Sequence, residues 1–184
     1  MKFKTLILTT FILSIVNLSF AQDKPWANPI IKDYGRILDL ENVAVTPDPN
    51  MEYKILIEIV HDMKKPGRLN FYANNVARLI NLHAIGGVKP ENLNVTVVIH
   101  AAATNSVINA EAYEKKYKVE SPYVKFYEAL DEAGVEMIVC GQSLNMFGHQ
   151  PEDVVPQIKI ATSALTVMST YQLKGYSFFK MGGS

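Results

Sequence analysis

Short apolar runs and helical periodicities alternate along the chain from residue 53 onward. The runs at residues 53–60 (YKILIEIV), 94–100 (NVTVVIH) and 135–139 (VEMIV) are rich in Ile and Val. Their length and composition are typical of buried parallel strands. Residues 69–85 instead carry apolar side chains at spacings of three and four, which predicts an amphipathic helix.

Shorter elements continue this alternation. Helices are predicted over residues 109–118, 121–133 and 163–173, and strands over residues 159–162 and 176–181. Ser121 and Pro122 fit the cap and first turn of one of these helices. Right-handed crossovers between parallel strands place helices on both faces of a sheet. The pattern therefore predicts one α/β domain with a mainly parallel sheet over residues 53–184.

The first 21 residues have the features of a secretory signal peptide. Lys2 and Lys4 form a basic start, an apolar run follows, and a small-residue cleavage site ends at Ala21. A retained membrane anchor is the alternative, but the run is shorter than the ~20 apolar residues that span a bilayer. We therefore expect a periplasmic or secreted protein without membrane attachment after cleavage.

Residues 22–52 are irregular, because four prolines interrupt them. Residues 34–38 (YGRIL) are the strand-like piece of this segment. We interpret the segment as an N-terminal arm that lies over the domain or over a neighbouring subunit, with Trp26, Ile30 and Ile31 as its contacts. A flexible leader is the alternative for residues 23–28.

Charge and cysteine content narrow the function classes. Cleavage of the signal peptide would remove Lys2 and Lys4 and leave 16 basic against 18 acidic residues, so the sequence carries no electrostatic footprint for nucleic acid. The single cysteine, Cys140, excludes an internal disulfide. In an oxidising compartment an odd cysteine indicates burial, an intermolecular bond or a reactive thiol.

Cys140 follows the predicted strand at residues 135–139 and lies in a tight turn. Gly141 permits a sharp bend there, and Ser143 is a plausible cap for a following helix. The thiol would then lie at the carboxyl edge of the sheet, where α/β proteins bind ligands. Backbone N–H groups and the helix dipole would favour its thiolate. The alternative is that Cys140 is a small buried hydrophobe, which is the usual fate of a free cysteine.

Other polar residues are expected at the same edge. They are His61 and Asp62 after the first strand, His100 and Asn105 after the second, and Gln142 and Ser143 after the third. Either His61 or His100 could lower the pKa of the thiol or carry its proton. Gln142, Ser143 and Asn105 are candidates for substrate binding. His83 and His149 fall in a helix and a loop without a recognisable chemical setting.

Cofactor motifs are absent from the sequence. A metal site from His61, His100 and Cys140 is conceivable, but no local metal-binding spacing supports it. The loop after the first strand lacks a glycine-rich phosphate-binding pattern, and no G-x-S-x-G motif is present. We therefore expect neither a metal nor another cofactor.

Three short segments resemble the DsrE/DsrF-like family, in particular its exported members of the YchN type. They are residues 139–143 (VCGQS), 98–104 (VIHAAAT) and 133–136 (AGVE), and the likeness covers residues 53–181. The resemblance implies a three-layer α/β/α fold with a five-stranded, mostly parallel sheet, and homo-oligomers that are trimers or hexamers. It also implies that Cys140 accepts sulfur as a persulfide and passes it to a thiol-bearing partner protein.

Two functions follow from these expectations. The first is an exported sulfur carrier, similar to a sulfurtransferase, in which Cys140 is the nucleophile and His100 or His61 assists it. The second is a non-catalytic, oligomeric module that binds a small ligand or a protein and in which Cys140 is structural. Neither composition nor motif spacing decides between them.

Overall fold

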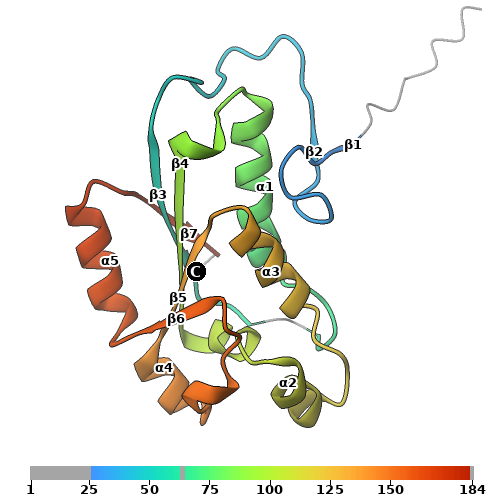
Figure 1. Ribbon diagram of the computed structural model, residues 1–184, viewed down its shortest axis with the longest axis vertical. Helices are drawn as coiled ribbons and strands as arrows, with labels where there is room; N and C mark the ends of the chain where they lie inside the picture. Colours follow the sequence, from blue (N-terminus) through green and yellow to red (C-terminus); the bar gives the residue numbers. More distant parts are fainter. Residues whose placement is uncertain (1–25, 63–64, 183–184) are drawn as a thin grey trace, which may run out of the picture.

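The computed structural model describes residues 26–62 and 65–182 (Figure 1). The predicted signal peptide, residues 1–21, lies outside the described residues. None of the helices in the described part of the chain combines the length and the hydrophobicity that a membrane span requires.

A five-stranded sheet organises the molecule. Its strands are β3 (Tyr53–Ile59), β4 (Leu93–Ile99), β5 (Glu136–Cys140), β6 (Ile158–Ala161) and β7 (Ser177–Met181). They lie in the order β6-β5-β4-β3-β7, and every neighbouring pair is parallel. The α/β fold expected from the sequence is confirmed, and the sheet is wholly rather than mostly parallel.

Helices cover both faces of the sheet. The longer ones are α1 (Phe71–Ile85), α2 (Ala110–Tyr117), α3 (Val124–Glu132), α4 (Gly141–Met146) and α5 (Ala164–Leu173). Three short 3-10 helices are η1 (Pro90–Asn92), η2 (Ala101–Ser106) and η3 (Pro151–Asp153). Figure 1 shows α1 and α3 on one side of the sheet and α5 on the other. The architecture is therefore three layers.

Successive side chains along a strand point to opposite faces of the sheet, so alternate residues pack in different cores. Ile57, Val97 and Met137 pack in the larger core with α1 and α3. Their neighbours Val98 and Ile138 belong to a smaller cluster beneath α5. We call the side of the sheet that carries this smaller cluster the α5 face.

Several predicted boundaries shift by one to three residues. Helix α1 begins at Phe71, where Asn70 accepts a hydrogen bond from the backbone N–H of Tyr72 and so caps the helix. Helix α3 begins at Val124 rather than at Pro122, and Ser121 accepts a hydrogen bond from the backbone N–H of Tyr123 ahead of it. The polar loop expected after β4 is the 3-10 helix η2.

Asn81, a buried residue of α1, makes several of the hydrogen bonds that attach the N-terminal segment to this helix. Asn81 Oδ1 accepts hydrogen bonds from the backbone N–H groups of Ile30 and Ile31, and its amide donates to three backbone carbonyls of residues 31, 34 and 35. Ile31 is buried in the larger core, whereas Trp26 is 57% exposed and lies against Arg36. Two short antiparallel strands, β1 (Trp26–Ala27) and β2 (Ile37–Leu38), close this segment.

Candidate functional site

Cys140 is the last residue of β5 and the N-cap of α4. The sequence predicted that the strand ends at Val139 and that Cys140 lies in the following turn. In the structure the strand is one residue longer and includes Cys140. This register directs Cys140 to the α5 face, where it packs with Val98, Ile138 and Ala164 at 4% exposure. The thiol is therefore held between the first turns of α4 and α5.

Hydrogen-bond donors surround the sulfur. Burial by itself raises the pKa of the Cys140 thiol, but hydrogen bonds from the Ser143 hydroxyl and from the backbone N–H groups of Ala164, Ser143 and Gln142 outweigh burial and lower the pKa. The neutral thiol is a weak acceptor and forms no regular capping bond with α4. The same donors interact far more strongly with a thiolate, so the site favours the anion.

Ser143 is oriented by the chain segment that follows β4. Its Oγ accepts a hydrogen bond of 3.1 Å from the backbone N–H of Ala101. Ser143 lies inside α4 rather than at its cap, which corrects the sequence prediction. Ala101 has φ +50°, a left-handed conformation that is unfavourable for a residue with a side chain. The backbone is thus strained at the point where it directs the Ser143 proton toward the sulfur.

His100 stands beside Cys140. Ile99 pairs with Val139 in the parallel ladder, so the next residues along β4 and β5, His100 and Cys140, are neighbours. Adjacent strands lie about 4.8 Å apart. The Nε2 atom of His100 lies 2.7 Å from Oε1 of Glu58 on β3.

Glu58 was not among the candidate residues from the sequence. Its signal is present in the printed chain, since Glu58 is the acidic residue within the apolar run ILIEIV. It is 7% exposed in the structure. A carboxyl group in a buried strand position requires a partner, and that requirement could have singled it out.

His61 lies away from the thiol. It follows β3, and β4 separates β3 from β5 in the sheet. Its ring packs near Tyr72 of α1, and a Cβ atom added at Gly182 would meet this ring. The structure therefore brings His100, but not His61, to Cys140.

Asn105 belongs to a separate polar cluster. Its amide donates to Asp62, and its Oδ1 accepts from Lys116 Nζ at 2.6 Å and contacts His149 Nε2 at 3.0 Å. Burial, with the nearby charge of Lys116, lowers the pKa of His149. His149 was expected to have no chemical setting, but it is buried in this cluster together with Asn105.

This Asn105 cluster adjoins a groove of about 600 Å³ between α2 and the turn that follows α4. Lys116 and His149 line the groove together with Glu111, Glu152 and Asp153. The lining therefore carries both signs of charge. It does not select an anion or a cation.

The other sequence candidates have smaller parts. The Gln142 side chain is exposed and its amide lies 3.4 Å from the carbonyl of Thr162, so its contribution to the thiol comes through its backbone N–H. Among the described residues there is no group of three or more His, Cys, Asp and Glu side chains that could hold a metal ion.

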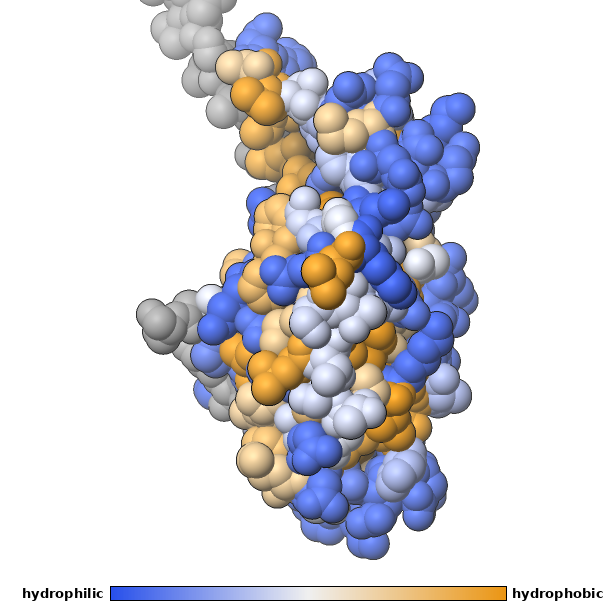
Figure 2. Space-filling model, turned by 90° about the vertical axis from the view of Figure 1, so that its left-hand side faces the viewer, coloured by the Kyte–Doolittle hydropathy of each residue, from blue (hydrophilic) through white to orange (hydrophobic). Residues whose placement is uncertain are grey.

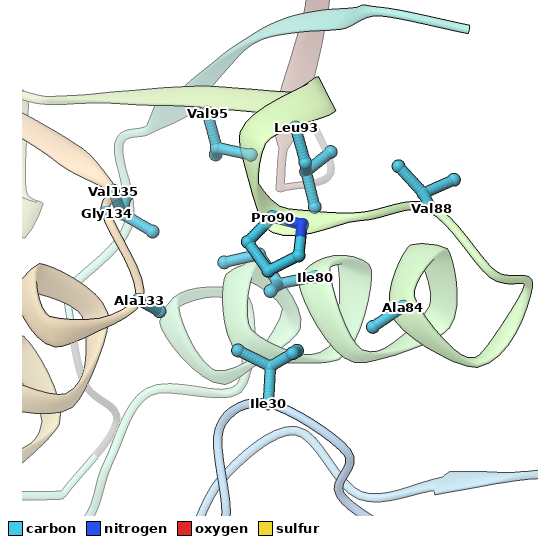
Figure 3. A pocket seen from close by; sticks show the side chains of 10 residues that line it. All are labelled: Ile30, Ile80, Ala84, Val88, Pro90, Leu93, Val95, Ala133, Gly134 and Val135. Atoms are coloured by element: carbon cyan, nitrogen blue, oxygen red, sulfur yellow. The ribbon is translucent and has the colours of Figure 1, made fainter. Parts of the chain in front are cut away.

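An apolar cavity lies far from this chemistry. Figure 3 shows Ile30, Ile80 and Val135 converging on it from the N-terminal segment, α1 and the start of β5. Its volume is about 20 Å³, which is room for a single water molecule and for no larger ligand. It is a packing defect at the amino-terminal side of the sheet rather than a binding site.

Comparison with known proteins identifies a family with which this chain shares its sequence pattern. The DsrE/DsrF-like family matches residues 54–181, which is most of the chain. This chain belongs to the DsrE/DsrF-like family. The family assignment covers all five strands of the sheet and both helices that flank Cys140.

A solved structure supports the fold of this DsrE/DsrF-like protein. The protein of unknown function MTH1491 from Methanobacterium thermoautotrophicum is 18% identical, with a TM-score of 0.53. The match covers 70% of this chain and 98% of that chain. Identity at this level shows the fold alone. No curated protein matches the sequence.

Proposed function

We propose that this protein carries sulfane sulfur on Cys140 as a persulfide. The observation that supports the proposal is the set of donors around the sulfur, the Ser143 hydroxyl and three backbone N–H groups, which lowers the pKa of the thiol despite its burial. A thiolate is the nucleophile in sulfur exchange. The same donors would hold the negative charge of a persulfide anion.

The reaction is balanced without an added oxidant. The Cys140 thiolate attacks the outer sulfur of a donor persulfide, a new S–S bond forms at Cys140, and the S–S bond of the donor breaks. The donor leaves as a thiolate and takes up the proton that Cys140 lost. A thiol on an acceptor protein would reverse these steps and remove the sulfur.

Mass spectrometry of the intact protein tests the proposal. Incubation with glutathione persulfide under anaerobic conditions should add the mass of one sulfur atom to the wild type and nothing to Cys140→Ser. A wild-type protein that gains no sulfur contradicts the proposal. Dithiothreitol should restore the original mass, because a persulfide, unlike a sulfinic acid, is reducible by thiols.

We propose further that the protein is exported and works as a trimer or hexamer. The basic start and apolar run of residues 1–21 support export. Exposed apolar side chains support assembly: Leu165 and Leu173 on α5 are 73% and 89% exposed, and Phe178 on β7 is also exposed. Figure 2, which looks onto the α5 side, shows hydrophobic surface among polar side chains. N-terminal sequencing of exported protein should begin at Gln22.

A binding module with a structural cysteine is the second candidate. The 4% exposure of Cys140 and the groove beside the Asn105 cluster favour it. The rate of alkylation by iodoacetamide in the native state separates the two functions. A carrier thiol should react faster than a free cysteine peptide at pH 7, whereas an inert packed thiol should react only after unfolding.

A further inference from the structure

Glu58 places a carboxyl group on the α5 face, beside the apolar cluster of that face. Leu56 and Val98 are its neighbours in the cluster beneath α5. A buried charge is unfavourable unless a partner compensates it. The partner of Glu58 is His100, whose Nε2 lies 2.7 Å from Oε1. Lys180, which pairs with Glu58 in register on β7, is exposed.

This contact decides which ring nitrogen of His100 carries the proton. An ionised carboxylate only accepts hydrogen bonds, so the nitrogen that faces it, Nε2, must carry hydrogen. In the neutral ring Nδ1 then has the lone pair and is the basic atom. His100 keeps extended backbone geometry, with φ −155° and ψ −173°, and its neighbour on β5 is Cys140. The basic nitrogen therefore belongs to the residue next to the thiol.

We propose that Glu58 is a positioning residue for the chemistry of Cys140, because it holds His100 in the form that has hydrogen on Nε2 and a free Nδ1. The proposal rests on the proposed function. In the uptake step the Cys140 S–H bond breaks and its proton moves to Nδ1. The thiolate then bonds to the outer sulfur of a persulfide donor, and the proton passes from the imidazolium to the departing donor thiolate. One S–S bond forms at Cys140 and the S–S bond of the donor breaks, so the step needs no oxidant or reductant.

Glu58→Gln tests this assignment. A glutamine side chain offers both an acceptor and a donor, so it no longer selects one ring form of His100. We expect the rate of sulfur uptake from glutathione persulfide to fall ~10-fold or more, by analogy with the loss of carboxylates that orient metal-binding histidines. The pH profile of the rate should change as well. Glu52→Gln, an exposed change beside the same strand, is the control and should leave both unchanged.

A double variant separates positioning from simple structural damage. If Glu58 acts through His100, Glu58→Gln combined with His100→Gln should be no slower than His100→Gln alone. Multiplied losses in the double variant would overturn the proposal. An unchanged rate and pH profile in Glu58→Gln would overturn it too.

Nitrogen-15 NMR of the His100 ring keeps this test independent of sulfur transfer. The wild type should show the form with hydrogen on Nε2, and Glu58→Gln should show a mixture of the two neutral forms. If the wild type takes up no sulfur, the persulfide function fails, and the ring spectrum still reports on Glu58. A wild-type ring with hydrogen on Nδ1 would contradict the positioning role directly.

Discussion

The lowered pKa of the Cys140 thiol depends on a few directed hydrogen bonds. The Ser143 hydroxyl is the side-chain donor among them, and the backbone N–H of Ala101 occupies its acceptor site. With its lone pair engaged, the hydroxyl proton is free to point at the sulfur. Ser143 therefore connects the strained first residue of η2 to the thiol at the end of β5.

Ser143→Ala should raise the pKa of Cys140, because it removes the side-chain donor that stabilises the thiolate. Alkylation by iodoacetamide rises with pH through the pKa of the thiol. In the wild type its midpoint should lie below the ordinary value of about 8.5, and in the variant it should move upward. Ser169→Ala on the exposed side of α5 is the matched control. Identical midpoints in all three proteins would show that Ser143 has no such role.

Ala101→Gly should stabilise the protein by about 1 kcal/mol, because glycine tolerates the positive φ of this residue without steric strain. The backbone N–H that Ser143 needs remains, so alkylation of Cys140 should be unchanged. Urea unfolding measures the first effect. Ala102→Gly, one residue further in the same 3-10 helix and without positive φ, should destabilise instead. Equal effects of the two changes would contradict the strain at Ala101.

At the scale of elements, the Asn105 cluster joins several of the segments that connect the strands and helices. Asn105 lies in η2, and its amide contacts Asp62 after β3, Lys116 in α2 and His149 after α4, so four separate segments meet at one side chain. Nearby Asp62 and Asp153 add negative charge, yet burial and Lys116 keep the pKa of His149 lowered. The folded state thus favours the neutral imidazole.

This cluster makes stability depend on pH. A basic group with a lowered pKa binds its proton more readily in the unfolded state, where the pKa is about 6.5. The contribution of His149 is therefore complete above that pH and is lost as pH falls through the folded pKa. His149→Gln should lose stability at pH 8 and show a shallower decline between pH 7 and 5 in urea unfolding. Parallel curves for the two proteins would exclude this role.

At the scale of the whole molecule, β7 stands out because it is an edge strand with two exposed aromatic side chains. It lies at the edge of the sheet, and Phe178 and Phe179 are exposed on its two faces. Edge strands can pair with another chain unless charge or proline protects them, and β7 carries a single charged residue, Lys180.

Phe178→Glu combined with Phe179→Glu should therefore reduce the size of the assembly, because charge replaces apolar contact area. Sedimentation velocity should show a trimer or hexamer for the wild type and smaller species for the variant. Val45→Glu, a change at a still more exposed apolar residue of the N-terminal segment, should leave the assembly intact. A wild-type monomer would contradict assembly altogether.

The sequence predicted the strands of the sheet and their alternation with helices, because runs such as ILIEIV have few structural alternatives. The sequence could not predict toward which face of the sheet each side chain points. Ending β5 at Val139 rather than at Cys140 leaves the thiol in a turn, whereas one more strand residue commits it to the α5 face. Strand order is equally hidden, and that order separates His61 from Cys140 while joining His100 to it.

The position of β3 in the sheet has a consequence for how the polypeptide is made. β3 is the first strand of the sheet to be synthesised, and it is flanked by β4 on one side and by β7, the last, on the other. A nascent chain on the ribosome therefore keeps one side of its earliest strand unsatisfied until residues 177–181 have emerged. Such long-range pairing slows folding, so the sheet cannot be completed before nearly the whole polypeptide has been synthesised.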